Sequence, residues 1–331
     1  MRFRLATLPL FLVIGCTHPG AGSDSVVEDS DTSDTYRDTW VTTDTSDTSG
    51  TSDTSTALTP VARSMWVWDT SVAGDVTATE ALLAFAEANG VTTLFLSCDP
   101  VGYGSEGAEE RYHDFVQAAH AADVEVYGMS GYSWFSVPCD AGLAGQPTCW
   151  EEGWAVYEAC AASNVGFDGI MDDTEPASTP EGSWFTDHAR RAAWHLEYLE
   201  GIRARIGDLP FHHAIPAWYD EEESVALGDT GALETLDVWI AGVVDVVGVM
   251  SYRDTASAIL DIAASELEGG PVWIGVETAP SSEGEHITFA EEGASALSAA
   301  LDEMEAEVGT HPNLRGFMVD AYESWRELGT E

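Results

Sequence analysis

Two short apolar runs of this 331-residue chain end in carboxylates, although they lie far apart in the sequence. The first ends in Asp172-Asp173-Thr174-Glu175-Pro176 and the second in Gly275-Val276-Glu277-Thr278. Two carboxylates that flank one bond are the usual means of cleaving a glycosidic linkage, because one protonates the leaving oxygen and the other acts as base or nucleophile. These residue types therefore predict glycan hydrolysis, provided that the fold brings Glu175 and Glu277 to one site.

Asp173 and Glu175 lie two residues apart on an extended segment. Side chains alternate along a strand, so both face the same way, about 6 to 7 Å apart along the backbone, whereas Asp172 points elsewhere or caps the loop. Carboxylates so close resist double ionisation, which raises the pKa of one of them towards the range of a general acid. The alternative is a solvated acidic pair at a strand end.

The elements that must position these carboxylates alternate regularly from residue 64 to residue 331. Apolar runs predict eight strands, at 65–68, 92–97, 124–129, 169–173, 210–216, 246–251, 271–277 and 315–319. Helical patterns follow them at 79–89, 108–122, 150–163, 187–206, 232–241, 256–268, 289–308 and 323–328, and Gly90 fits a C-terminal cap of the first helix. Eight alternating units predict an α/β fold, a (β/α)8 TIM barrel, whose chemistry sits at the C-terminal strand ends.

The segment that ends at Glu175 resembles the strand-four signature of family 18 glycoside hydrolases, Asp-Gly-x-Asp-x-Asp-x-Glu. Asp168, Gly169, Asp173 and Glu175 match it, whereas Met171 replaces the first inward Asp and Thr174 the usual aromatic residue. In that family the Glu is the acid, the preceding Asp positions the acetamido group of the substrate, and a Met-x-Tyr stretch assists. Met250-Ser251-Tyr252 matches that stretch. The resemblance implies a substrate-assisted mechanism that uses Glu175, Asp173 and Tyr252.

Glu175-Pro176 also resembles the Glu-Pro ending of strand four in the large clan of retaining glycosidases, in which a second Glu on strand seven is the nucleophile. Glu277 falls at that position. This resemblance implies Glu175 as acid/base and Glu277 as nucleophile, with carboxyls about 5 to 5.5 Å apart and with Tyr252 orienting Glu277 by a hydrogen bond. We favour this scheme because Met171 breaks the family 18 signature. The alternative for Glu277 is an ion pair with Arg253 or another arginine.

Three further stretches, at 252–254, 275–278 and 321–325, resemble a family of uncharacterised bacterial secreted barrel proteins. That resemblance covers most of residues 64 to 328 and implies no activity.

Because a fold does not fix a function, two alternatives to the glycosidase hypothesis stay open. One is a non-catalytic carbohydrate-binding or adhesin-like lipoprotein that keeps the barrel, and the other is hydrolysis of a non-sugar bond by the same acids.

Aromatic side chains near the predicted strand ends favour a carbohydrate ligand, because sugar rings pack their C–H faces on indole while their hydroxyls bond to carboxylates and arginine. They are Trp66, Trp68, Trp134, Trp218, Tyr219, Tyr322 and Trp325. We expect the substrate to contact Trp68, Trp218, Arg253, Asp320, Tyr322 and Trp325. Trp66 and Trp68 share a face and are explained equally well as barrel filling.

The sequence predicts no cofactor and no catalytic metal. His212 and His213 are adjacent on a strand and point to opposite faces, so they cannot chelate one ion together. No Cys-x-x-Cys spacing suggests zinc. The alternative is a calcium ion held by the rim acids Asp320 and Glu323.

The N-terminal residues have the pattern of an export signal. Arg2 and Arg4 precede the apolar run Leu5 to Ile14, which is too short for a permanent membrane span. Val13-Ile14-Gly15-Cys16 resembles a bacterial lipobox, which implies a signal at residues 1–15 and lipidation of Cys16; an ordinary cleaved signal is the alternative. We therefore expect an exported, membrane-anchored lipoprotein, periplasmic or on the cell surface, that touches the membrane only through this anchor.

Residues 16–60 are rich in Asp, Ser and Thr and are expected to form a disordered tether, because they bury too little apolar surface to offset their chain entropy. The barrel domain then spans 61–331. Of the net charge of −46, nine acids and three arginines in residues 1–60 account for −6, which leaves −40 on the barrel domain. So acidic a surface repels nucleic acid and anionic membranes, which excludes both as direct ligands of the domain. The composition carries no signal for an oligomeric state.

Four cysteines remain besides Cys16 in an oxidising compartment. Cys139 and Cys149 bracket a loop with Gly and Pro and are predicted to form a disulfide worth roughly 3 kcal/mol on the loop-entropy model. For Cys98 and Cys160 the spacing fixes no pairing, and we expect buried free thiols, the more frequent state of such residues.

Overall fold

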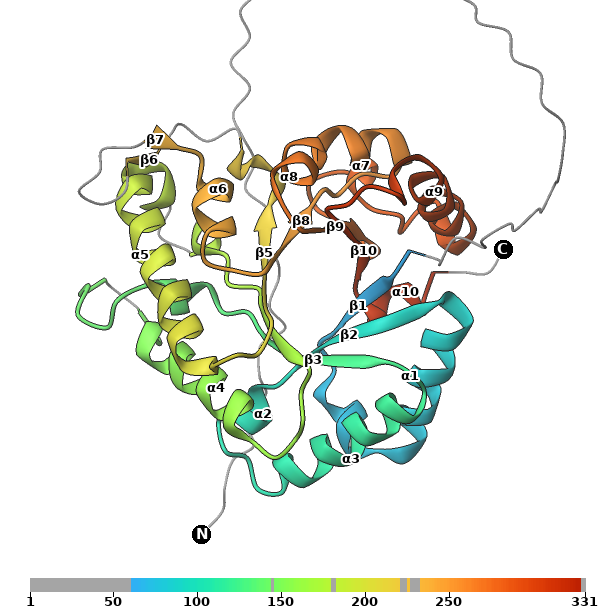
Figure 1. Ribbon diagram of the computed structural model, residues 1–331, viewed down its shortest axis with the longest axis horizontal. Helices are drawn as coiled ribbons and strands as arrows, with labels where there is room; N and C mark the ends of the chain where they lie inside the picture. The colour runs from blue at the N-terminus through green and yellow to red at the C-terminus, as the bar shows by residue number, and fades with distance from the viewer. Residues whose placement is uncertain (1–60, 144–145, 180–182, 221–224, 227–232, 329–331) are drawn as a thin grey trace, which may run out of the picture. The chain divides into compact units, whose positions relative to one another are not determined.

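The computed structural model describes residues 61–143, 146–179, 183–220, 225–226 and 233–328. Eight parallel strands close into a barrel in the order β1-β10-β9-β8-β5-β4-β3-β2, with helices around them (Figure 1). The strands are β1 Arg63–Val67, β2 Val91–Ser97, β3 Glu125–Ser130, β4 Gly169–Asp172, β5 Phe211–Pro216, β8 Val246–Met250, β9 Val272–Glu277 and β10 Leu314–Asp320. The predicted TIM barrel is confirmed, and each predicted strand agrees with an observed one to within two residues at either end.

The helices follow the prediction with a few differences. They are α1 Val76–Asn89, α2 Asp99–Gly102, α3 Ala108–Ala121, α4 Trp150–Ala162, α5 Ser183–Ile206, α6 Leu236–Ala241, α7 Ala256–Ile262, α8 Ala264–Gly269, α9 Gly293–Val308 and α10 Tyr322–Trp325. The predicted helix at 256–268 is divided into α7 and α8, because Ala263 leaves helical geometry with φ −80° and ψ 2°. The short α2 and the two-stranded pair β6 Val225–Ala226 and β7 Leu233–Glu234 were not predicted.

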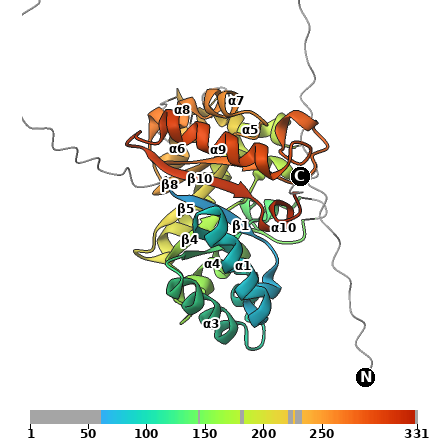
Figure 2. The same cartoon turned by 90° about the vertical axis from the view of Figure 1, so that its right-hand side faces the viewer.

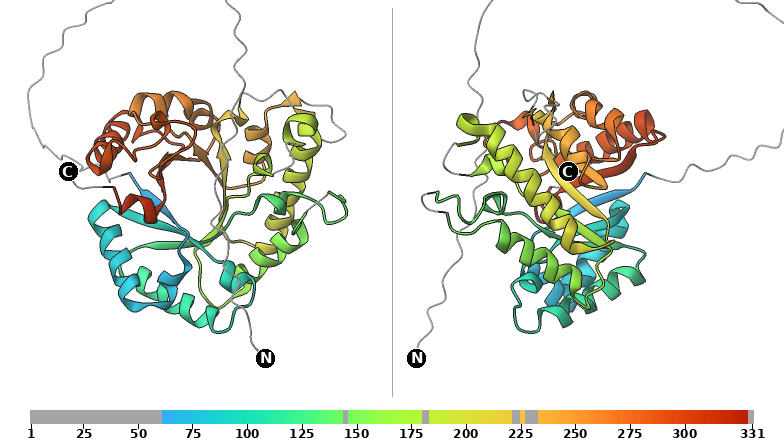
Figure 3. Two further views of the ribbon diagram at one scale, coloured as in Figure 1. Left: turned by 180° about the vertical axis from the view of Figure 1, so that it is seen from behind. Right: turned by 60° about the vertical axis from the view of Figure 1, so that its left-hand side comes forward.

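The helices group around the barrel by sequence. From the side, α7, α8 and α9 lie together on one side of the strands and α1 and α3 on the other (Figure 2). The long helix α5 runs beside α4, and Figure 3 brings this pair to the front. Helix α1 ends at Gly90, whose left-handed φ of 68° is the predicted glycine cap. No helix among the described residues is long and apolar enough to cross a membrane. The predicted signal, the lipidation site Cys16 and the tether lie outside the described residues.

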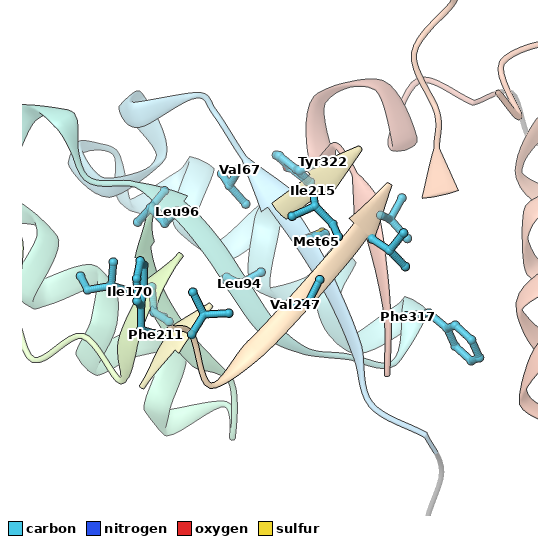
Figure 4. Packing of buried hydrophobic residues seen from close by; sticks show 14 of the residues in the cluster. Met65, Val67, Leu94, Leu96, Ile170, Phe211, Ile215, Val247, Phe317 and Tyr322 are labelled. Carbon is cyan, nitrogen blue, oxygen red and sulfur yellow. The ribbon is translucent and has the colours of Figure 1, made fainter. Parts of the chain in front are cut away.

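Alternation along the strands separates the two buried layers. Outward side chains such as Met65, Leu94 and Ile215 pack between the strands and the surrounding helices (Figure 4). Inward side chains fill the barrel itself: Trp66, Phe95, Tyr127, Met129, Met171, Ala214, Val246, Trp273 and Met318. The barrel is therefore a packed core, and Trp66 belongs to its filling. Any site must lie beyond this plug, at one of the two mouths.

Two disulfides crosslink the segments between β2 and β4. Cys139 and Cys149 are bonded, as the sequence predicted. Cys98 and Cys160 are also bonded, with Cα atoms 6.3 Å apart, so the expectation of free thiols was wrong. Cys98 follows β2 and Cys160 lies on α4, and α2, which begins directly after Cys98, packs against α4. That packing, which the sequence spacing does not reveal, brings together two cysteines 62 residues apart.

Candidate active site

The C-terminal ends of three strands place four acids at one mouth of the barrel. On β4, β9 and β10, the inward residues Met171, Trp273 and Met318 fix the alternation, so Asp173, Glu277 and Asp320 follow on the inward side. Asp320 and Glu277 are direct register partners on neighbouring strands. Glu175 lies two residues beyond Asp173. We call Asp173, Glu175, Glu277 and Asp320 the acidic rim.

Asp320 is the acid that connects the rim to its aromatic neighbours. Its Oδ1 accepts a hydrogen bond from Trp68 Nε1 at 3.4 Å, and its Oδ2 accepts one from the Tyr252 hydroxyl at 3.3 Å. Burial raises the pKa of Asp320 to about 7, although both hydrogen bonds act in the opposite direction. Tyr252 was expected to orient Glu277, but its hydroxyl donates to Asp320 instead.

Glu277 is held by its own backbone. Its Oε1 accepts hydrogen bonds from the N–H groups of Thr278 at 2.7 Å and Ala279 at 2.6 Å. Burial and then the nearby Asp320 raise the pKa of Glu277 to about 8, against the effect of these hydrogen bonds. None of the ion pairs among the described residues involves Glu277, so the alternative of a salt bridge to Arg253 is not what the structure shows.

Asp173 and Glu175 form the second pair of the rim. Burial raises the pKa of Asp173 well above its ordinary range, and repulsion from Glu175, Asp320 and Asp172 adds to the effect. Burial also raises the pKa of Glu175, whose Oε2 accepts a hydrogen bond from Ser178 at 3.5 Å. Asp173 Oδ1 is buried and has no hydrogen-bond partner among the described residues. A close acidic pair with a raised pKa is what the strand spacing predicted.

All four acids of the rim lie close enough to Tyr252 to affect its pKa. Burial raises the pKa of its hydroxyl well above the ordinary value, and so does repulsion from Asp320, Glu277, Asp173 and Glu175. Barrel closure therefore brings together the four residues predicted to be catalytic, and adds Asp320 and Trp68. Trp68 is 37% exposed, as a side chain that stacks on a ligand would require.

Three other residues predicted to bind substrate are placed differently. Tyr322 and Trp325 are only 4% and 5% exposed, because α10 turns both rings against Phe85 of α1, with centroids 5.4 and 5.2 Å away. Their predicted stacking on sugar does not fit this packing. Arg253 turns its Nη1 to the carbonyl oxygen of Tyr252 at 2.6 Å.

Trp218, the remaining predicted contact, lies in an aromatic cluster just after β5. Its ring packs edge-on against Trp184 and Tyr219, with centroids 5.8 and 4.8 Å away, and its side chain is half-buried. This packing fixes the ring and leaves part of it exposed.

Sequence reasoning missed a buried polar cluster behind the rim. Asp172 lies on the outward side of β4, where it contacts His213 of β5 and Tyr157 and Tyr198 of the helix layer. Alternation already requires that one of two consecutive acids enters the helix layer. The β4–β5 register pairs Asp172 with His213, so knowledge of this register would have identified His213 as the partner of Asp172. The neighbouring His212 points into the barrel, so the prediction that the two histidines face opposite ways is confirmed.

Among the described residues, one group has donor atoms close enough together to hold a metal ion: Cys139, Cys149 and Glu151. The sulfurs of Cys139 and Cys149 are bonded to each other in a disulfide. Two cavities lie away from the acidic rim. One, of about 910 Å³, is lined by the Gly104–Glu110 segment, His113 and Asn164, and the other, of about 440 Å³, opens at the N-terminal mouth beside His212 and Arg315. The candidate site therefore rests on the convergence of the acids.

No protein-family model and no curated protein matches this chain. Among solved structures, the glycoside hydrolase domain of PgaB (BpsB) from Bordetella bronchiseptica is 10% identical, with a TM-score of 0.49 over 78% of this chain and 94% of that one. A chitinase from Rhizomucor miehei is 16% identical, with a TM-score of 0.49 over 79% and 95%. A fungal β-1,4-galactanase is 15% identical, with a TM-score of 0.48 over 81% and 91%. At these values the likeness adds nothing to the functional argument, which rests on the acidic rim.

Proposed function

We propose that the protein is a glycoside hydrolase that acts on a polysaccharide or another glycan. The observation that carries this proposal is the convergence of four carboxylates and Tyr252 at the C-terminal mouth, with no arginine paired to the four acids in the described residues. Acids without counter-charges keep raised pKa values, and a general acid needs its proton near neutral pH. The exposed Trp68 supports a sugar ligand.

In this proposal Glu175 protonates the glycosidic oxygen as the C–O bond breaks, and Glu277 Oε2 bonds to the anomeric carbon. Glu175 then removes a proton from water, which displaces Glu277 and releases the sugar with retained configuration. The hydrogen bonds to Oε1 support this role, since they fix the carboxylate and leave Oε2 without a hydrogen bond from the described residues. Because the pKa of Glu277 is about 8, it must lose its proton before it can act as nucleophile.

One observation favours a second mechanism. Asp173 Oδ1 is buried and has no hydrogen-bond partner among the described residues, and a pKa of about 8 favours the protonated form of Glu277 near neutral pH. In a substrate-assisted reaction the acetamido oxygen of the substrate attacks the anomeric carbon, Asp173 orients the acetamido N–H, and Glu175 is again the acid. The two mechanisms share Glu175 and differ in their need for Glu277 and for an N-acetyl group.

The experiment is a screen of neutral, N-acetylated and amino-sugar glycans with wild type and Glu175→Gln, in which released reducing ends are measured. We expect kcat to fall about 10²- to 10⁴-fold in Glu175→Gln. The matched control is Glu125→Gln at the opposite end of the barrel, which should keep its activity. Binding without turnover in both wild type and Glu175→Gln would instead identify a carbohydrate-binding module.

A Glu277→Gly variant separates the two mechanisms. If Glu277 is the nucleophile, azide restores turnover and gives a glycosyl azide of inverted configuration, and wild-type kcat/KM rises with pH up to about 8. If Asp173 and the substrate supply the second group, azide has no effect and only 2-acetamido sugars react. Full activity of Glu277→Gly without azide would end the nucleophile assignment.

The charge of the domain narrows the substrate class. A net charge near −40 on the barrel domain repels polyanions, so we propose that the substrates are neutral or amino-sugar polymers rather than uronic acid polymers.

We also propose that the protein is a lipoprotein anchored at Cys16 through the 16–60 tether. Incorporation of labelled palmitate into wild type and its loss in Cys16→Ser tests the anchor, and equal labelling of both proteins would refute it.

A further inference from the structure

The cluster behind the acidic rim is centred on a fully buried carboxylate. Asp172 is 0% exposed and collects hydrogen-bond donors from three elements. Its Oδ1 accepts from the hydroxyls of Tyr157 on α4 at 2.7 Å and Tyr198 on α5 at 3.1 Å, and its Oδ2 lies 2.8 Å from His213 Nδ1 on β5. Hydrogen bonds from His213 and Tyr157 keep the pKa of Asp172 below its ordinary value despite the opposing effect of burial.

His213 extends the cluster into the helix layer. An ionised carboxylate only accepts, so His213 Nδ1 carries the proton that faces Asp172. On the other side of the ring, His213 Nε2 lies 3.0 Å from Nε2 of His195 on α5. Burial lowers the pKa of His195 to about 3, so His195 is a neutral partner at neutral pH. Strand β4 is thereby connected through Asp172 to α4, α5 and β5.

Asp172 also holds the residue that separates the two acids of β4. Thr174 donates to it twice, from Oγ1 at 2.8 Å and from the backbone N–H at 3.3 Å. On the other side, Asp173 N donates to the carbonyl oxygen of Ser130 at 2.9 Å, and the backbone of Gly131 lies so close that a Cβ there would be 2.6 Å from the carbonyl oxygen of Asp173. The segment that carries Asp173 and Glu175 is thus held from both sides.

The cluster is an exception among the strands of the barrel. The last outward side chain is apolar on most of the other strands: Val67, Leu96, Ile215, Val249, Val276 and Val319. A buried charged cluster is weak evidence for stability, because well-packed apolar side chains of similar volume are often as stable. The packing of the barrel therefore does not by itself require a carboxylate at this position of β4.

We propose that Asp172 is a positioning residue for the proposed hydrolysis, and that it fixes Asp173 and Glu175 by holding Thr174 against α4, α5 and β5. This inference rests on the proposed function. Misplacement of a catalytic group by about 1 Å lowers a rate about 100-fold, which sets the size of the expected effect.

The test compares Asp172→Asn with Asp168→Asn. Asp168 is the matched control, because it precedes the same strand at the opposite mouth, pairs with His120 at 2.9 Å and accepts from Val126 N at 2.7 Å. We expect kcat per folded molecule to fall about 100-fold in Asp172→Asn, with KM within about threefold. Asp168→Asn should lose stability and keep its kcat. Thr174→Val, which removes the Oγ1 donor, should lower kcat, and the conservative Thr174→Ser should restore it.

A second readout does not depend on turnover. The titratable groups that surround Asp172 are Tyr157, Tyr198, His195, His213 and Asp173. Since the charge of Asp172 helps to raise the pKa of Asp173, Asp172→Asn should lower the Asp173 midpoint in a ¹³C-carboxyl NMR titration, and Asp168→Asn should leave it unchanged. Wild-type kcat in Asp172→Asn would overturn the inference. If wild type cleaves no glycan, the proposed function fails, and an unchanged Asp173 midpoint would then overturn the inference separately.

Discussion

The two mouths of the barrel use the same residue type in opposite ways. At the N-terminal mouth each of three acids has a basic side chain within reach: Asp302 lies 2.8 Å from Arg63, Asp168 2.9 Å from His120 and Asp245 2.6 Å from Arg203. At the C-terminal mouth, no ion pair among the described residues includes a member of the acidic rim. The fold places acids at both mouths, so the two mouths differ in whether these acids have basic partners.

Their pKa values diverge accordingly. Partial burial acts to raise the pKa of Asp245, but the hydrogen bonds from Arg203 and the Phe211 N–H, together with the charge of Arg203, outweigh it and lower that pKa. Burial without a counter-charge raises the pKa of Asp320 to about 7 and of Glu277 to about 8. Paired acids stabilise the folded state, whereas unpaired acids retain protons that a reaction can use. Under the proposed function, the N-terminal mouth contributes stability and the C-terminal mouth carries the reaction.

The C-terminal side of the barrel also carries the covalent crosslinks of the domain. Both disulfides lie there, one joining Cys98 after β2 to Cys160 on α4 and the other closing the loop between β3 and α4. Replacing Cys98 and Cys160 by Ala should lower the free energy of unfolding by about 4 kcal/mol, because the crosslink closes 62 residues. Urea unfolding measures this. Replacing Cys139 and Cys149, which lie 10 residues apart, should have a smaller effect, about 3 kcal/mol. If both variants kept the wild-type free energy of unfolding, the prediction that the disulfides stabilise the domain would be wrong.

The acidic rim should make the folded state less stable as the pH rises. The pKa of Asp320 rises from 3.8 to about 7 on folding, so between these values the folded state binds a proton that the unfolded state has lost. Stability therefore falls with increasing pH in that window, and Glu277 extends the fall to about pH 8. Asp320→Asn should reduce the fall by about 2 kcal/mol, less than the full shift implies because the side chain is partly exposed. Chemical denaturation at about pH 5 and about pH 8 measures it; equal slopes in both proteins would contradict the assignment.

The sequence predicts the barrel and the rim for the same reason. Strand alternation fixes the inward side once Met171, Trp273 and Met318 are buried, and barrel closure then places Asp173, Glu277 and Asp320 at one mouth. Nothing comparable fixes side chains after a strand has ended. Tyr322 and Trp325 follow β10 as expected, yet α10 rotates them against Phe85. The Cys98–Cys160 bond and the contacts of Asp172 with helices α4 and α5 depend likewise on packing between elements distant in the chain, and hydrophobic periodicity carries no such information.

Substitution of an acid at the N-terminal mouth should lower the stability of the protein and leave its activity unchanged. Asp245→Asn removes the partner of Arg203 and the charged acceptor of the Phe211 N–H, and should lower the free energy of unfolding by about 1 kcal/mol near neutral pH. Since the folded-state pKa of Asp245 lies below 3.8, this contribution is full above that pH and is lost as the pH falls through the folded-state value. Activity on the best glycan should not change. A loss of kcat that exceeds the loss of folded protein would show that this mouth also serves the reaction.

The smallest effect is expected at the Arg63–Asp302 pair, whose acid is largely exposed. Arg63 at the start of β1 contacts Asp302, whose side chain is 69% exposed, so solvent screens the interaction. A double-mutant cycle of Arg63→Gln and Asp302→Asn should give a coupling of about 0.5 kcal/mol at low ionic strength and almost none in molar salt. Asp302 lies on α9, away from the acidic rim, so both variants should keep the wild-type kcat. A coupling that persisted in molar salt would mean that the N-terminal mouth is held by a buried network, and the contrast between the mouths would then be one of burial rather than of pairing.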